Sequence, residues 1–358
     1  MKKHLSDLLT SKLVIAAFLF GFVVFAVVLV IPYARSSTYV RGQEVSEVLS
    51  KAVEAVTPKV LDTKEYDRLL LKNANYASTT GTSTPRLWPA KAPYPKYGAI
   101  LPFNRIVAYY GNFYSKNMGV LGEYESPVVL DKLRREAAKW EAADPETPVV
   151  PAIEYIAVVA QDNPGKSGKY RARMPDDQID KAIAMAKEVN GIVILDVQVG
   201  LSTVESEIPA LEHYLSMPQV HLALDPEFSM KGGEEPGEVI GSLNANDINY
   251  VANYLAELVK KNDLPPKVLI VHRFTQRMVQ NAEAITPLPE VQVVMVMDGW
   301  GSPARKIGTY KHFIYPEPVQ FTGFKLFYKN DLKPPSERLL TPQELLNLTP
   351  QPLFIQYQ

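Results

Sequence analysis

The stretch Val220–Phe228, VHLALDPEF, joins an apolar strand to two carboxylates. Parallel strands that are covered on both faces read as continuous apolar runs, and the run from Leu222 to Leu224 has this character. Asp225 and Glu227 follow at the C-terminal end of the run, separated only by Pro226. The stretch therefore predicts an interior parallel strand that delivers acidic side chains where it ends.

Strand-like and helix-like segments alternate on both sides of this stretch, from residue 104 to the last residue. The predicted strands are 106–110, 152–159, 192–197, 220–224, 268–272, 291–298, 324–328 and 353–357. The predicted helices between them are 130–140, 177–189, 204–216, 247–261, 275–284, 304–312 and 343–348. This size and order predict an α/β fold of the (β/α)₈ barrel type. A doubly wound open sheet is the alternative, but it normally has a glycine-rich turn after its first strand, and residues 109–112 (YYGN) do not form one.

Polar side chains gather at the C-terminal ends of these strands, which is where (β/α)₈ barrels carry their active sites. Residues two apart point the same way, so Asp196 with Gln198, and Asp225 with Glu227, can face one cavity. Paired carboxylates near aromatic rings are the minimum for glycoside cleavage, in which one acid protonates the leaving oxygen and the other attacks carbon or activates water. The predicted catalytic residues are Asp225, Glu227, Asp196, Asp298 and Glu154. The predicted substrate-binding residues are Tyr109, Tyr110, Gln198, His272, Arg273, Trp300, Lys325 and Gln356.

Structural roles for the same residues remain open. Asp225 can cap the turn at Pro226, and Asp298 can open the following helix in the same way. His272 can be a satisfied core histidine. Glu154 can form a buried ion pair with Lys325.

Two other functions use the same set of side chains. Carboxylates and one histidine can hold a divalent metal in a hydrolase that acts on phosphodiesters or acetylated sugars, although the chain has no HxH or ExxH spacing. A non-catalytic carbohydrate-binding barrel is the third possibility. The glycosidase-like hydrolase is the leading prediction, and no cofactor is predicted.

Composition limits the remaining choices. Hydrophobic residues make up 46% of the 358 residues, which is sufficient for a large core. The net charge is −1, from 38 basic and 39 acidic residues, so the balance predicts no nucleic-acid partner. There are no cysteines, which excludes thiol catalysis, disulfides and a lipid anchor attached to cysteine.

The uncharged segment Leu13–Pro32 is long enough to cross a bilayer and predicts a membrane anchor. A cleaved signal peptide is the alternative, and both interpretations place the rest of the chain outside the cytoplasm. The predicted organisation is a cytoplasmic tip and transmembrane anchor over 1–35, a helical stalk and Ser/Thr/Pro-rich linker over 36–100, and the barrel over 101–358. An N-terminal extension packed on the barrel is the alternative to the linker, since Leu87, Trp88 and Tyr94 are apolar.

A set of short motifs resembles a known family. The motifs are YYGN at 109–112, LDxQ at 195–198, LALDPEF at 222–228, VHRFT at 271–275, MDGWGSPxxK at 297–306 and GFKLFY at 323–328. Over residues 104–358 they resemble an exported bacterial family of mostly uncharacterised barrel proteins, many of them membrane or lipid anchored. The resemblance implies a (β/α)₈ barrel similar to the glycoside hydrolase superfamily, and it assigns no catalytic role to any residue. The chain differs from lipoprotein relatives because it lacks the lipidated cysteine.

Overall fold

The computed structural model describes residues 60–76 and 86–358. The predicted anchor, Leu13–Pro32, lies outside the described residues, as does the first part of the predicted stalk. No helix in the described ranges is both long enough and apolar enough to cross a membrane.

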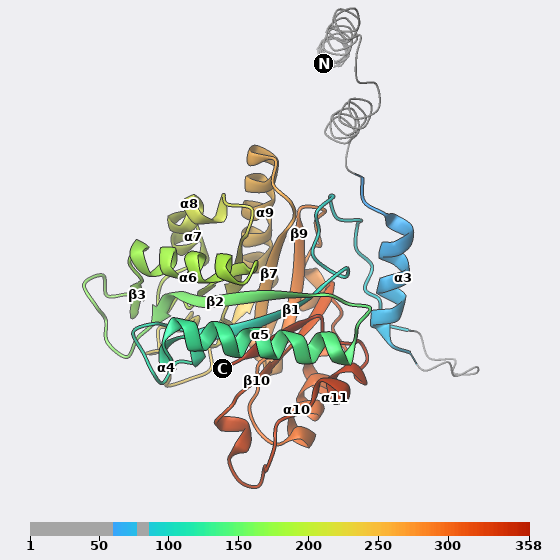
Figure 1. Ribbon diagram of the computed structural model, residues 1–358. Helices are drawn as coiled ribbons and strands as arrows, with labels where there is room; N and C mark the ends of the chain where they lie inside the picture. The colour runs from blue at the N-terminus through green and yellow to red at the C-terminus, as the bar shows by residue number, and fades with distance from the viewer. Residues whose placement is uncertain (1–59, 77–85) are drawn as a thin grey trace, which may run out of the picture. The chain divides into compact units, whose positions relative to one another are not determined.

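Eight parallel strands close into a barrel, because β1 pairs with β2 on one side and with β11 on the other (Figure 1). The barrel strands are β1 (Arg105–Gly111), β2 (Val149–Ala160), β4 (Ile192–Val197), β5 (Val220–Leu224), β7 (Lys267–Arg273), β9 (Val291–Met297), β10 (Phe321–Leu326) and β11 (Phe354–Tyr357). A short strand, β3 (Arg171–Arg173), pairs antiparallel with β2. Closure confirms the predicted (β/α)₈ barrel and excludes the open sheet.

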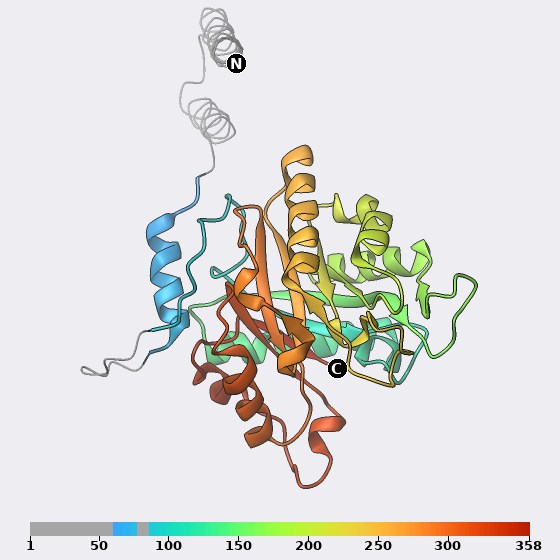
Figure 2. The ribbon, with the colours of Figure 1, turned by 180° about the vertical axis from the view of Figure 1, so that it is seen from behind.

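The helices lie outside the barrel strands (Figures 1 and 2). They are α3 (Thr63–Ala74), α4 (Val120–Glu123), α5 (Ser126–Ala143), α6 (Asp176–Glu188), α7 (Val204–Glu207), α8 (Glu212–Leu215), α9 (Ala245–Asn262), α10 (Pro303–Thr309) and α11 (Pro342–Leu346). The predicted helix 204–216 is interrupted at Pro209, which has no N–H to donate and begins a separate 3₁₀ turn.

The predicted helix 275–284 is wrong. This segment contains two 3₁₀ turns, Gln276–Met278 and Ala282–Ala284, around a two-residue strand, β8 (Val279–Gln280), which pairs with β6 (Leu243–Asn244). The Arg273 guanidinium donates hydrogen bonds to three backbone carbonyls of the segment, those of Thr275, Gln276 and Val279. These carbonyls turn toward a buried cation instead of continuing along a helix axis.

Alternation along the strands separates two apolar cores. Side chains such as Ala108, Ala223 and Ile270 fill the inside of the barrel. Their sequence neighbours, such as Val107 and Leu222, pack outward against the helices. The interior core occupies the N-terminal part of the strands, so polar side chains can occupy the C-terminal part.

The N-terminal segment closes the bottom of the barrel. Tyr66 of α3 and Leu101 are buried in the interior core, and Gln292 holds the Leu101 backbone through both its N–H and its carbonyl. Asn73 Nδ2 donates to the carbonyl of Gln351. The compact unit therefore begins at Val60 and not at residue 101 as predicted, and the packed extension describes residues 60–76 and 86–100 better than the linker does.

Candidate functional site

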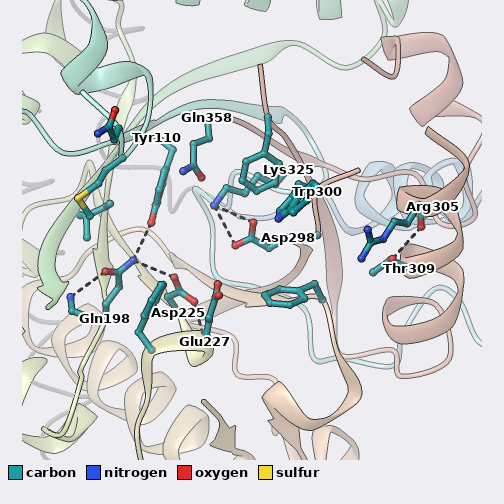
Figure 3. A pocket seen from close by; sticks show the side chains of 18 residues that line it. Tyr110, Gln198, Asp225, Glu227, Asp298, Trp300, Arg305, Thr309, Lys325 and Gln358 are labelled. Carbon is teal, nitrogen blue, oxygen red and sulfur yellow. Dashed lines mark hydrogen bonds and ion pairs between the residues drawn. The ribbon is translucent and has the colours of Figure 1, made fainter. Parts of the chain in front are cut away.

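A cavity of about 380 Å³ opens at the C-terminal ends of the barrel strands. Figure 3 shows the carboxyl groups of Asp225, Glu227 and Asp298 pointing into this one space. The predicted site residues that line the cavity are Tyr110, Gln198, Asp225, Glu227, Asp298, Trp300 and Lys325. The cavity thus collects polar groups from β1, from β10 and from the segments that follow β4, β5 and β9.

Asp225 and Glu227 are placed by a short turn that follows β5. Asp225 Oδ1 accepts the backbone N–H of Glu227 at 3.1 Å and caps the 3₁₀ turn Pro226–Phe228. The tight turn carries the Glu227 side chain back over the barrel mouth, where it lines the cavity. Asp225 is therefore both the cap and a cavity residue.

Gln198 fixes the other oxygen of Asp225. Its Oε1 accepts the backbone N–H of Ala160 at 3.1 Å, which leaves Nε2 to donate to Asp225 Oδ2 at 3.2 Å and to the Tyr110 hydroxyl at 3.3 Å. The Tyr110 hydroxyl in turn donates to Asp196 Oδ2 at 2.9 Å. The Ala160 N–H can bond only to the oxygen of the Gln198 amide, so the amide nitrogen must face Asp225 and Tyr110. This fixes which group donates at each step from Gln198 to Asp196.

Asp298 lies between two cations. Lys325 Nζ is 3.0 Å from its Oδ1, and His272 Nδ1 is 3.1 Å from its Oδ2. Burial alone would raise the pKa of Asp298, but the charges and hydrogen bonds of Lys325 and His272 outweigh it and lower that pKa below its usual value. Asp298 is thus held ionised at the edge of the cavity.

His272, Glu154, Gln356 and Asp196 lie in the barrel interior and do not line the cavity. His272 Nε2 is 3.4 Å from Glu154 Oε1, and Gln356 Nε2 donates to Glu154 Oε2 at 2.7 Å. Burial opposes a charge on His272, but Asp298 and Glu154 raise its pKa well above the ordinary value. Glu154 therefore pairs with His272 and Gln356, and Lys325 takes Asp298 as its ion-pair partner.

The pKa values of Glu227, Asp225 and Asp196 are raised, in contrast to that of Asp298. Burial, followed by the charges of Asp225 and Asp298, raises the pKa of Glu227 to about 8. Burial also raises the pKa of Asp225 above its usual value and that of Asp196 to about 8. At neutral pH the site therefore holds protonated Glu227 and ionised Asp298 in one cavity.

Two predicted substrate-binding residues point away from the cavity. The Tyr109 hydroxyl lies 2.9 Å from the Tyr328 hydroxyl in the outer core. Arg273 Nη1 donates to Glu317 Oε2 at 2.6 Å on the outer side of the barrel. Both residues directly neighbour an inward-facing residue, and successive side chains of a strand face opposite sides. The prediction placed both members of each pair at the site, whereas in the structure Tyr110 lines the cavity and His272 reaches it only through Asp298.

Several cavity residues were not among the predicted site residues. They are Asn117, Met118, Ile156, Ala160, Phe274, Gly299, Arg305, Thr309, Phe327 and Gln358. Most of them lie on loops or at the start of a helix, where period-2 alternation gives no direction. Arg305 was within reach of the sequence, because it belongs to the motif at 297–306 that contains Asp298 and Trp300.

Within residues 60–76 and 86–358, no group of three or more histidine, aspartate or glutamate side chains is arranged to hold a metal ion. The physical reason is visible at Asp298, whose oxygens already face the ammonium of Lys325 and the ring of His272. The metal-dependent hydrolase considered from the sequence has no ligand set in this part of the chain.

No family model and no curated protein matches the chain. Solved structures with similar folds include a ruminal GH26 endo-β-1,4-mannanase, with 12% identity and a TM-score of 0.34 over 72% of this chain and 59% of that chain. The YdhT protein from Bacillus subtilis has 11% identity and a TM-score of 0.38, over 84% of this chain and 87% of that one. GH26C from Muricauda sp. has 10% identity and a TM-score of 0.31, over 82% and 81%. The chain spans 59% of the length of the mannanase, and a likeness at this level assigns neither substrate nor activity.

Proposed function

We propose that this protein is a glycoside hydrolase-like enzyme that uses Glu227 as general acid and Asp298 as the ionised carboxylate. The observation that carries the proposal is that one cavity holds two carboxyl groups whose pKa values are moved in opposite directions. Such a separation distinguishes the acid from its anionic partner in glycoside cleavage. Asp225 contributes by raising the pKa of Glu227.

The proposed reaction needs no group beyond these side chains and water. The Glu227 proton transfers to the leaving oxygen as the bond between that oxygen and the anomeric carbon breaks. The Asp298 carboxylate stabilises the positive charge that develops on the sugar. Water then adds its hydroxyl group to the anomeric carbon, and the proton it releases returns to Glu227.

Aromatic side chains around these groups support a sugar as the substrate. Phe228, Phe274 and Phe327 line the cavity, and Trp300 stands at its mouth with 47% of its surface exposed. Flat apolar faces next to polar groups are suited to the mixed surface of a sugar ring. We propose that the substrate is a polysaccharide of the cell envelope or of the environment.

An assay of the full chain against a panel of polysaccharides tests the proposal. We expect new reducing ends from at least one of mannan, β-glucan, chitin or peptidoglycan glycan strands, measured near neutral pH. Glu227→Gln should release no reducing ends. Its matched control is Glu283→Gln, which changes the same chemical group at an exposed position that does not line the cavity. Binding of sugars without any new reducing ends would support the non-catalytic carbohydrate-binding barrel instead.

We further propose that residues 13–32 anchor the protein in a membrane with the barrel outside the cytoplasm. The support is the uncharged apolar run itself, flanked by Lys12 on its N-terminal side. Phe20→Arg combined with Val24→Arg should release the chain from the membrane fraction, because each central arginine costs about 2.5–3.5 kcal/mol on insertion. The measurement is the fraction retained after an alkaline wash.

The control for the anchor is Phe20→Leu combined with Val24→Leu, which keeps the segment apolar and should keep the protein in the membrane fraction. Accessibility of the barrel to protease added outside the cytoplasm checks the orientation. Recovery of the wild-type chain in the soluble fraction without cleavage would contradict the anchor.

A further inference from the structure

The loops that follow β9 and β10 are joined at one buried carboxylate, Asp331. Its Oδ1 accepts the backbone N–H of Gly301 at 2.9 Å, and its Oδ2 accepts the backbone N–H of Phe327 at 2.9 Å. Lys306 Nζ, also buried, donates to the same Oδ2 at 2.7 Å. A carboxylate that is buried and shared in this way fixes the two loops relative to each other.

This junction brings three side chains together at one edge of the cavity mouth. The Arg305 guanidinium carbon is 5.7 Å from the centre of the Trp300 ring, and Lys333 Nζ is 5.2 Å from it. The aliphatic stem of Arg305 crosses Gly301, where an added Cβ would lie 2.9 Å from the arginine Cδ. Glycine at 301 therefore leaves room for the arginine, whose head group extends toward Trp300 (Figure 3). We call Trp300, Arg305 and Lys333 the mouth cluster.

The charge of the mouth cluster is not neutralised by a carboxylate. Among the ion pairs of the described residues, none involves Arg305 or Lys333, and both side chains are exposed. Asp331, the carboxylate that joins the two loops, is buried and pairs with Lys306. Lys329, close by in sequence, differs because it pairs with Glu123 at 2.9 Å. An indole ring attracts cations but leaves their charge in place.

We propose that the mouth cluster binds an anionic substituent of the substrate, a carboxylate, phosphate or sulfate group carried by a sugar. The inference rests on the proposed function, since it assumes that the cavity receives a carbohydrate. Arg305 lines that cavity, and its planar fork of N–H groups matches the geometry of carboxylate and phosphate oxygens. A neutral sugar can accept hydrogen bonds from the two unpaired cations but has no charge to pair with theirs.

The ion pairs inside the cavity give this arrangement a direction. Lys325 and His272 already pair with Asp298, so they offer an anion less than the unpaired Arg305 and Lys333 do. The substituent is therefore drawn to the edge where Arg305 and Lys333 lie, while the uncharged glycosidic bond reaches Glu227. The mouth cluster selects the substrate and orients it by the same interaction.

Calorimetric binding to the full chain tests the inference with matched probes. Trigalacturonate is compared with its methyl ester, and glucose 6-phosphate with glucose, so that the two pairs separate carboxylate from phosphate recognition. We expect at least one anionic probe to bind about tenfold more tightly than its neutral partner, and this preference to weaken as ionic strength rises. Arg305→Gln should reduce the preference about tenfold, and Lys333→Gln by a smaller factor.

Lys311→Gln is the matched control, because it removes the same charge from an exposed side chain that does not line the cavity. It should change the preference less than twofold. Equal binding of anionic and neutral probes in both pairs, or an equal effect of Lys311→Gln and Arg305→Gln, would overturn the mouth cluster as an anion site. Anion-selective binding without hydrolysis of any glycan would instead overturn the proposed catalysis and keep the site, so the two failures are distinguishable.

Discussion

Replacing Glu227 by glutamine is expected to lower kcat by about 10²- to 10⁴-fold, which is the range supplied by a positioned general acid. Glutamine keeps the size of the side chain and cannot transfer a proton to the leaving oxygen. The backbone carbonyl of Glu227, and not its side chain, accepts the N–H of Gly241. The substitution therefore keeps this backbone hydrogen bond of the turn. We expect an unchanged circular dichroism spectrum together with the loss of turnover, measured as reducing ends released from the substrate found with the wild-type chain.

The pH dependence gives a second signature of the same residue. Glu227 must be protonated to act as the acid, and its pKa is about 8, so wild-type activity should be present below that pH and fall as pH rises through it. Replacing Asp225 by asparagine removes a negative charge that raises the pKa of Glu227, and should move this alkaline limb to lower pH. An alkaline limb that stays in place in the Asp225→Asn variant would show that another group controls it.

The free energy of unfolding should also depend on the proton that Glu227 holds in the folded state. The folded state holds a proton on Glu227 up to a pH of about 8, whereas the unfolded chain releases it near the ordinary value of 4.5. The free energy of unfolding of the wild-type protein therefore decreases as pH rises between these two values. Glu227→Gln should remove this part of the slope, and Glu283→Gln should retain it. Wild-type turnover by the Glu227→Gln variant would remove Glu227 from the mechanism.

The barrel was readable from the sequence because its strands are buried on both faces. Ile192–Val197 and Val220–Leu224 are predicted with the bounds that the structure has, since each is a mostly apolar run with polar or glycine residues on both sides. The strand predicted at 324–328 instead runs from Phe321 to Leu326. Thr322 and Gly323 weaken the apolar pattern at its start, and only the packed barrel shows that a glycine fits there between Val296 and Phe354.

The candidate site was readable in part for a different reason. Strand ends predicted which residues approach the mouth, but a strand places neighbours on opposite sides, and the sequence alone did not fix which side is inside. Tyr110 faces the cavity and Tyr109 the outer core, whereas His272 faces the barrel interior beside Asp298 and Arg273 faces outward. The depth within the barrel was also unknown, so Glu154 could not be separated from the cavity residues.

Interactions between distant segments could not be predicted at all. The junction at Asp331 joins residues from the loops after β9 and β10, and no local pattern indicates that its carboxylate binds Gly301 and Lys306. The pairing of Lys325 with Asp298, and not with Glu154, likewise depends on how two strand ends are placed across the barrel. Such pairings decide the charge of each group, and therefore its chemical role.

Replacing Lys325 by methionine is expected to destabilise the fold by about 3–5 kcal/mol, because it leaves the buried Asp298 carboxylate without its main cation. The side chains of Lys325 and Asp298 are 5% and 6% exposed, so water compensates little for the lost ammonium group. His272 remains 3.1 Å from Asp298, which places the expected loss toward the lower end of the range. Chemical denaturation near neutral pH measures the change in the free energy of unfolding.

The matched control is Lys329→Met, which breaks an ion pair between side chains that are 66% and 26% exposed and should cost at most about 1 kcal/mol. The pH dependence identifies the cause of the larger loss. In the wild-type protein the pKa of Asp298 is lowered, so its ion pair stabilises the fold above the ordinary value of 3.8 and this stability is lost as pH falls through the lowered pKa. In the Lys325→Met variant, burial without the lysine raises the pKa of Asp298, and protonation of Asp298 then relieves the unpaired charge.

The difference in the free energy of unfolding between the wild-type protein and Lys325→Met should therefore shrink as pH falls toward about 4. Adding Asp298→Asn to Lys325→Met should recover part of the stability. A loss as small as that of Lys329→Met, or one that does not change with pH, would show that Asp298 is not held ionised by Lys325 and would leave Glu227 without its proposed anionic partner.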